Sequence, residues 1–103
     1  MNWYAVRTKT KKELLAKDYY SALGIEAYVP TYTTKRVWSD RIKKIKVSAI
    51  PGYLFFKLKN IDFDLVNLNP YTTNVVRTSS GKPAVIPPNE IECLKKYLYI
   101  FFH

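Results

Sequence analysis

Histidine, cysteine and glycine are scarce in this sequence, and their scarcity excludes several kinds of chemistry. The single cysteine, Cys93, cannot form an internal disulfide, and together with the single histidine, His103, it cannot complete a zinc site. A hydrolase needs a base beside its nucleophile, but the only histidine is the last residue. The three glycines are too scattered to form a phosphate-binding loop. We therefore expect no enzymatic activity, no metal and no cofactor.

Long apolar runs are also missing. No stretch approaches the roughly 20 apolar residues that a membrane helix needs, and the N-terminus lacks the apolar core of a secretory signal. A chain of 103 residues forms one domain, which at this size buries roughly 65% of the surface that the unfolded chain exposes. We expect one domain over residues 1–103 that is a monomer, lies in the cytoplasm and has no membrane partner.

Acidic residues are few in the first half of the chain. Residues 1–59 hold 13 of the 17 Lys and Arg but only four of the eight Asp and Glu, which gives a net charge of +9, whereas residues 60–103 are neutral. A strongly basic part of a folded domain favours a polyanionic partner, most often nucleic acid, although it can also serve solubility alone.

The most strand-like stretch of the sequence is Tyr53–Leu58, which follows the turn residues Pro51 and Gly52. Side chains alternate along a strand, so one face carries Leu54, Phe56 and Leu58 and the other carries Tyr53, Phe55 and the stem of Lys57. Both faces are apolar, which leaves two alternatives. Either helices cover the strand on both sides, or the Tyr53 and Phe55 face stays open to a partner protein.

The rest of the pattern predicts an α+β domain, with a mainly antiparallel sheet flanked by helices. Further strands are expected at residues 3–8, 25–29 and 73–78, and a protruding hairpin at about 32–47 with its turn at residues 39–40. A first helix should start at a capping box, Thr10 to Glu13, and stop at Gly24. A short helix should follow Asn60 or Asp62, and a last helix should begin at Pro88. The predicted buried positions are Leu15, Ala16, Tyr19, Ala22 and Leu23 in the first helix and Ile91, Leu94 and Leu98 in the last.

The hairpin is the most basic segment, with six Lys or Arg and one acid between residues 35 and 46. One interpretation is that it holds a nucleic-acid backbone through Lys35, Arg36, Arg41, Lys43 and Lys44. The other is that these cations only keep an exposed strand edge soluble.

Several short motifs occur in an order that resembles the N-terminal domain of the NusG family of transcription elongation factors. They are Trp3-Tyr4, Val29-Pro30, Pro51-Gly-Tyr-Leu-Phe55, Val76-Arg77, and Ile86-Pro87 leading to Glu90-Ile91. Within the family, Trp38-Ser-Asp-Arg41 in a lysine-rich hairpin is similar to the specialised paralogues of the RfaH and UpxY kind.

The resemblance implies a function in transcription. Family members dock an apolar patch on the clamp helices of the largest subunit of bacterial RNA polymerase and suppress pausing or termination, and the specialised paralogues do so at particular operons. The patch would lie on an open sheet face and comprise Trp3, Ala5, Ile50, Pro51, Tyr53 and Phe55. Arg7 departs from the pattern, because an apolar side chain is usual there. The non-template DNA strand would be contacted by Lys9, Lys11 and Lys12.

Most members of the family carry a small C-terminal KOW domain, and nothing after Ile91 matches one. The resemblance thus implies either a stand-alone N-terminal domain or a piece of a longer protein. A rival hypothesis is a ribosome- or RNA-associated nucleic-acid binder that has no polymerase contact and buries all of its aromatic residues. Solvent exposure of Tyr53 and Phe55 separates the two hypotheses.

Overall fold

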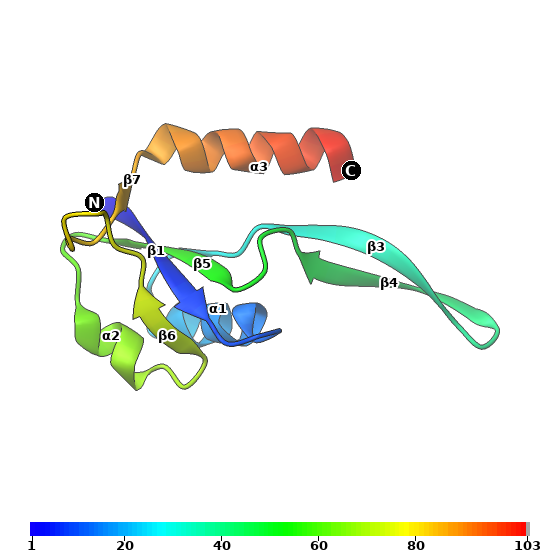
Figure 1. Cartoon of the computed structure of the whole chain (residues 1–103). Coiled ribbons are helices and arrows are strands. Elements are labelled where there is room, and N and C mark those ends of the chain that lie inside the picture. Colours follow the sequence, from blue (N-terminus) through cyan, green and yellow to red (C-terminus); the bar gives the residue numbers. More distant parts are fainter. Residues whose placement is uncertain (103) are drawn as a thin grey trace.

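The computed structural model describes residues 1–102, except for the side chains of Trp38 and residues 99–102. Along the chain the elements are β1 (Asn2–Thr8), α1 (Glu13–Ala22), β2 (Ala27–Tyr28), β3 (Thr31–Trp38), β4 (Arg41–Ser48), β5 (Tyr53–Leu58), α2 (Phe63–Leu68), β6 (Thr72–Val75), β7 (Val85–Ile86) and α3 (Pro88–Phe102). The main sheet is antiparallel, with the order β2-β5-β1-β6 and with β7 also paired to β1. β3 and β4 form a separate two-stranded ribbon that projects from the body (Figure 1). The predicted α+β architecture is confirmed.

β1 and β5 form the centre of the sheet. They pair from Asn2 opposite Leu58 to Arg7 opposite Tyr53. Directly paired residues share a face of an antiparallel sheet, so each face collects alternate side chains from both strands. The alternation predicted for Tyr53–Leu58 is confirmed, because Phe56 and Phe55 belong to different hydrophobic clusters.

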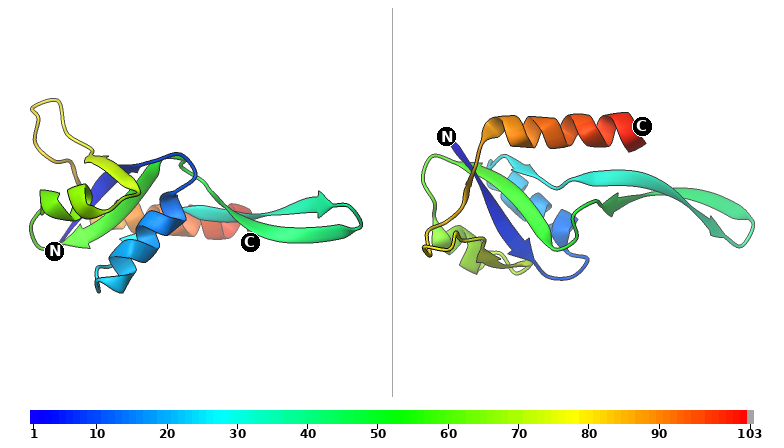
Figure 2. Two further views of the ribbon diagram at one scale, coloured as in Figure 1. Left: turned by 90° about the horizontal axis from the view of Figure 1, so that it is seen from below. Right: turned by 45° about the horizontal axis from the view of Figure 1, so that its top comes forward.

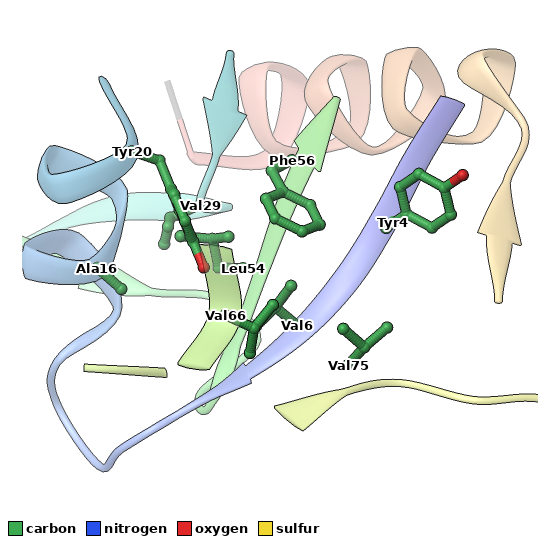
Figure 3. Close-up of a cluster of buried hydrophobic side chains, with 9 residues drawn as sticks. All are labelled: Tyr4, Val6, Ala16, Tyr20, Val29, Leu54, Phe56, Val66 and Val75. Atoms are coloured by element: carbon green, nitrogen blue, oxygen red, sulfur yellow. The ribbon is translucent and has the colours of Figure 1, made fainter. Parts of the chain in front are cut away.

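The first cluster lies between the sheet and helices α1 and α2, as Figure 3 shows. Phe56 and Tyr20 are both fully buried, and their ring centroids are 5.1 Å apart. The Tyr20 hydroxyl donates a hydrogen bond of 3.0 Å to the backbone carbonyl of Leu65, which ties α1 to α2. Burial raises the pKa of Tyr20, because the charged phenolate would lose its hydration.

The second cluster lies on the opposite face, beneath α3, which crosses the sheet on the side away from α1 and α2 (Figures 1 and 2). Trp3, Ala5 and Phe55 are only 3%, 6% and 9% exposed, and Ile91 of α3 packs among them. The expectation of an open face is therefore wrong for these three residues. The alternative, helices on both sides of the central strand, is the arrangement found. The physical reason is the apolar stripe of α3, which is removed from water only by packing against another apolar surface.

The start of α1 differs from the predicted capping box. The helix begins at Glu13, and the residue at its N-cap, Lys12, makes no side-chain capping bond. The carboxylate of Glu13 accepts a hydrogen bond of 2.9 Å from the backbone N–H of Gly52 instead, far away in sequence. The Glu13 carboxylate is thus used in a tertiary contact with the turn before β5 and not in a local cap. The predicted end of the helix is confirmed, because Gly24 adopts a left-handed conformation at φ +77°.

The buried stripe of α1 also differs from the prediction. Ala16 is buried as expected, but Tyr20 and Glu13 supply the other buried positions. Leu15 is 44% exposed and Leu23 is 56% exposed. The helix is thus rotated toward Tyr20, because that side chain fills the space above Phe56.

The remaining elements follow the sequence closely. The ribbon turns at Ser39 and Asp40, the side chain of Asp62 caps α2, and Pro88 begins α3. In α3, Ile91 and Leu98 are buried and Leu94 is half-buried. The predicted strands at 25–29 and 73–78 are shorter than expected, as the bounds of β2 and β6 show.

Candidate functional site

The six patch residues lie close together but differ in accessibility. Trp3, Ala5 and Phe55 form the buried floor of the second cluster, with Ile50 half-buried against it. Tyr53 at the start of β5 is half-buried, and Pro51 is exposed. The surface that a partner can reach is thus the edge of the predicted patch, made by Ile50, Pro51 and Tyr53. We call this surface the aromatic edge.

Arg7 contributes to this edge instead of interrupting it. Arg7 and Tyr53 are directly paired between β1 and β5, and the guanidinium carbon lies 5.5 Å from the centroid of the tyrosine ring. A guanidinium at this distance attracts the ring face electrostatically and restricts its rotamer. Arg7 therefore holds Tyr53 in place, although it departs from the apolar residue expected there.

Cations also cover the aromatic rings on the α3 side. The ammonium of Lys95 lies 5.8 Å from the Trp3 ring and 5.1 Å from the Tyr28 ring, and that of Lys57 lies 5.9 Å from Trp3. Burial raises the pKa of Tyr28, and the charge of Glu92 adds to the shift. These contacts fix α3 to the sheet through polar as well as apolar groups.

A groove of about 620 Å³ separates the start of α1 from the base of the ribbon. Its cationic lining comes from three different segments, which supply Lys11, Arg36 and Lys46. Its apolar lining is Leu14, Ile45, Val47 and Pro51. Glu13 also lines the groove, with one carboxylate oxygen engaged by the Gly52 N–H. A surface of this kind, basic with an apolar floor, suits a nucleic-acid strand whose phosphates meet the cations while a base or sugar contacts the floor.

The structure thus unites two of the predicted DNA contacts, Lys11 and Arg36, in one groove. Lys9 and Lys12 lie exposed in the same loop but do not line it. Sequence reasoning missed Lys46 and Leu14. Lys46 belongs to the basic run of the hairpin, and that signal was available. Leu14 was already outside the stripe predicted to be buried, but its position beside the ribbon depends on tertiary packing and had no sequence signal.

The other predicted DNA contacts, Lys35, Arg41, Lys43 and Lys44, are exposed along the ribbon, as Arg36 also is. Within residues 1–102 none of them takes part in an ion pair. In the described part of the chain, the cations of the ribbon are therefore free of ion-pair partners.

Among the described residues there is no group of three or more side chains able to hold a metal ion. In that same range no helix has the length and apolar character required to cross a membrane.

Comparison with known proteins gives one clear match. No curated protein sequence matches the chain. A family model described as "Transcription termination factor nusG" matches residues 1–95, which run from β1 into α3 and include the aromatic edge, the groove and the ribbon. That family consists of transcription factors and not of enzymes. Since the match spans most of the 103 residues, this chain belongs to the NusG family and is a transcription elongation and termination factor domain.

Proposed function

We propose that this domain binds the clamp helices of the largest subunit of bacterial RNA polymerase and suppresses pausing or termination at specific operons. The observation that carries the proposal is the aromatic edge in a chain of this family: Tyr53 and Pro51 remain accessible beside a buried aromatic floor. Aromatic side chains on a rigid support are enriched at protein interfaces, because they bury much area at little cost in conformational entropy.

The buried residues of the patch support this edge from below. Phe55 stacks on Tyr28 with 6.4 Å between ring centroids, and Ile50 packs against the same cluster. A helix of the polymerase would lie along Ile50, Pro51 and Tyr53, next to α3. Trp3, Ala5 and Phe55 would then act by positioning the edge, with direct contact limited to what α3 leaves uncovered.

Binding of the domain to core RNA polymerase tests the proposal. We expect Tyr53→Ala to weaken binding by about 2 kcal/mol, roughly thirtyfold, because a half-buried aromatic anchor is lost. The change in unfolding free energy should be small, since Tyr53 is not part of either buried cluster. Affinity is measured with core enzyme and with a fragment that carries the clamp helices.

Phe63→Ala is the matched control for this experiment. Phe63 is 40% exposed, and the guanidinium of Arg77 lies 4.9 Å from its ring, so the substitution also removes an arginine–aromatic contact. It should leave affinity for the clamp-helix fragment unchanged. Equal affinities of wild type and Tyr53→Ala for that fragment would contradict the proposed interface.

We further propose that the non-template DNA strand runs past Lys9, Lys11 and Lys12 into the groove beside α1. Support comes from Lys11, which lines the groove together with two cations of the ribbon. Replacing Lys11 and Lys12 with Ala should reduce the salt dependence of single-stranded DNA binding by about 1.4 units in a log-log plot, at about 0.7 per phosphate contact. The same substitutions at Lys59 and Lys82, which are exposed elsewhere, provide the control. An unchanged slope in the first double variant would remove the loop from the DNA site.

One observation favours the rival function, a nucleic-acid binder without polymerase contact. Phe55 is buried, as that hypothesis requires, whereas Tyr53 is only half-buried. The two functions differ in one measurement. The rival predicts binding to nucleic acid with the same salt dependence but no retention of the domain on core RNA polymerase.

A further inference from the structure

The β3–β4 ribbon reaches beyond the body that supports its base. Its strands have eight residues each, which corresponds to a length of about 26 Å at the rise of a β-strand. The molecule measures 50 × 29 × 27 Å along its principal axes, and Figure 2 shows that the ribbon accounts for the long one. Near the base, Ile45 and Val47 are half-buried against the body, whereas residues 35–37 and 41–44 are exposed. The outer half of the ribbon therefore has both faces available.

The pairing register assigns the exposed side chains to two faces. Lys35 lies opposite Lys44 and Val37 opposite Ile42, so these four share one face. The alternate pair, Arg36 with Lys43, lies on the other, as does Arg41. On the first face, two lysines on different strands precede an apolar pair at the tip.

The apolar pair is not explained by protection of an edge. Val37 is 76% exposed and Ile42 is 70% exposed, at the end of the ribbon farthest from the core. A ribbon that needs only solubility would carry charge at this position, because exposed β-branched residues on an unpaired strand edge invite association. Their position between basic residues instead suits a binding partner with a groove whose walls are polyanionic and whose floor is partly apolar.

We propose that the outer ribbon inserts into the major groove of double-stranded B-form DNA with the Lys35, Val37, Ile42 and Lys44 face inward. The major groove, about 12 Å wide, admits a two-stranded ribbon. Lys35 and Lys44 lie on different strands and so reach phosphates on opposite groove walls. Val37 and Ile42 meet base edges, where thymine offers a methyl group for apolar contact. This site is separate from the single-strand groove and does not depend on polymerase binding.

Charge complementarity and groove shape favour duplex DNA over other nucleic acids as the partner of the ribbon. Residues 35–46 carry six cations and one acid, and within residues 1–102 no ion pair neutralises the cations. A-form RNA is a poorer fit, because its major groove is too narrow and deep for a ribbon to enter. Single-stranded DNA offers one row of phosphates and no groove, so it gives the apolar pair at the tip no floor flanked by two phosphate walls.

The test compares two double variants that remove the same charge from opposite faces. Lys35→Gln with Lys44→Gln changes the inward face, and Arg36→Gln with Lys43→Gln changes the outward face at neighbouring positions. Duplex DNA binding of the full chain is measured against salt, and circular dichroism confirms that each variant is folded. The inward variant should lose about two units of log-log slope, at about 0.9 per phosphate contact, and the outward variant less than one. Equal losses in both would overturn the proposed orientation.

Two further measurements test which groove of the DNA is bound and whether the duplex must be DNA. Methyl green, a major-groove ligand, should displace the chain from the duplex, whereas netropsin, a minor-groove ligand, should not. Val37→Thr with Ile42→Thr keeps β-branched side chains but replaces a methyl group of Val37 and the ethyl group of Ile42 with hydroxyls, and should weaken duplex binding roughly threefold to tenfold without changing the salt slope. Displacement by netropsin alone, or equal affinity for an RNA duplex of the same sequence, would overturn the proposal.

Discussion

The two faces of the central sheet look alike in sequence but are built differently. On the α1 and α2 face, Phe56 is 0% exposed and packs against Tyr20, whose hydroxyl is satisfied by the backbone of α2. On the other face a single helix covers Trp3 and Phe55, and cations lie over the aromatic rings at its margin. The first face is an enclosed core, whereas the second is a core with an accessible aromatic edge.

This difference teaches where a binding surface can arise in a small domain. An edge beside a well-packed cluster is rigid, because its neighbours are already ordered by folding. Tyr53 lies at such a boundary, held on one side by Arg7 and flanked by the second cluster. The proposed binding through this edge would leave the domain folded and still offer an aromatic anchor.

The largest effect is expected on the enclosed face. Phe56→Ala should reduce the free energy of unfolding by about 3 to 5 kcal/mol, because a fully buried ring between Tyr4 and Tyr20 would leave a cavity. Urea denaturation followed by circular dichroism measures the change. Phe56→Leu, which keeps most of the apolar volume, should lose much less. A loss below 1 kcal/mol for Phe56→Ala would mean that this face is not the main core.

Phe55→Ala sharpens the comparison, because it removes the same side chain from the other face. We expect a loss of about 3 kcal/mol, at the lower end of the range for buried phenylalanine, since α3 can move to fill part of the space. Hydrogen exchange distinguishes the faces: amides of α3 should exchange faster in Phe55→Ala, while those of α1 keep their protection. Faster exchange throughout the domain would show that both faces unfold as one unit.

The sequence predicted the strands, the hairpin and the division of Tyr53–Leu58 into two faces, because these depend on alternation and turn residues that act locally. It did not predict that Trp3 and Phe55 are covered. That outcome depends on where α3 lies after Pro88, and its stripe of Ile91, Leu94 and Leu98 says only that it must cover something apolar. Among the candidate site residues, Lys11 and Arg36 line one groove because the fold places distant segments side by side, an arrangement that has no local signal.

The smallest of these effects concerns the contact that connects α1 to the central strand. Glu13 is 6% exposed, and its carboxylate accepts the N–H of Gly52 at 2.9 Å in place of the local cap that the sequence suggested. Glu13→Ala should cost about 1 to 2 kcal/mol, because the Gly52 N–H would lose its hydrogen-bond partner.

Glu13→Gln separates the hydrogen bond from the charge. The amide oxygen of glutamine can still accept the bond from Gly52, so this variant should lose less than about 1 kcal/mol. Thr10→Ala is the control for the predicted capping box and should have little effect, because no side-chain bond caps the helix. The three unfolding free energies, measured in urea under the same conditions, therefore rank the two explanations. A larger loss of unfolding free energy for Thr10→Ala than for Glu13→Ala would support the local cap. It would contradict the explanation that the contact with Gly52 anchors α1.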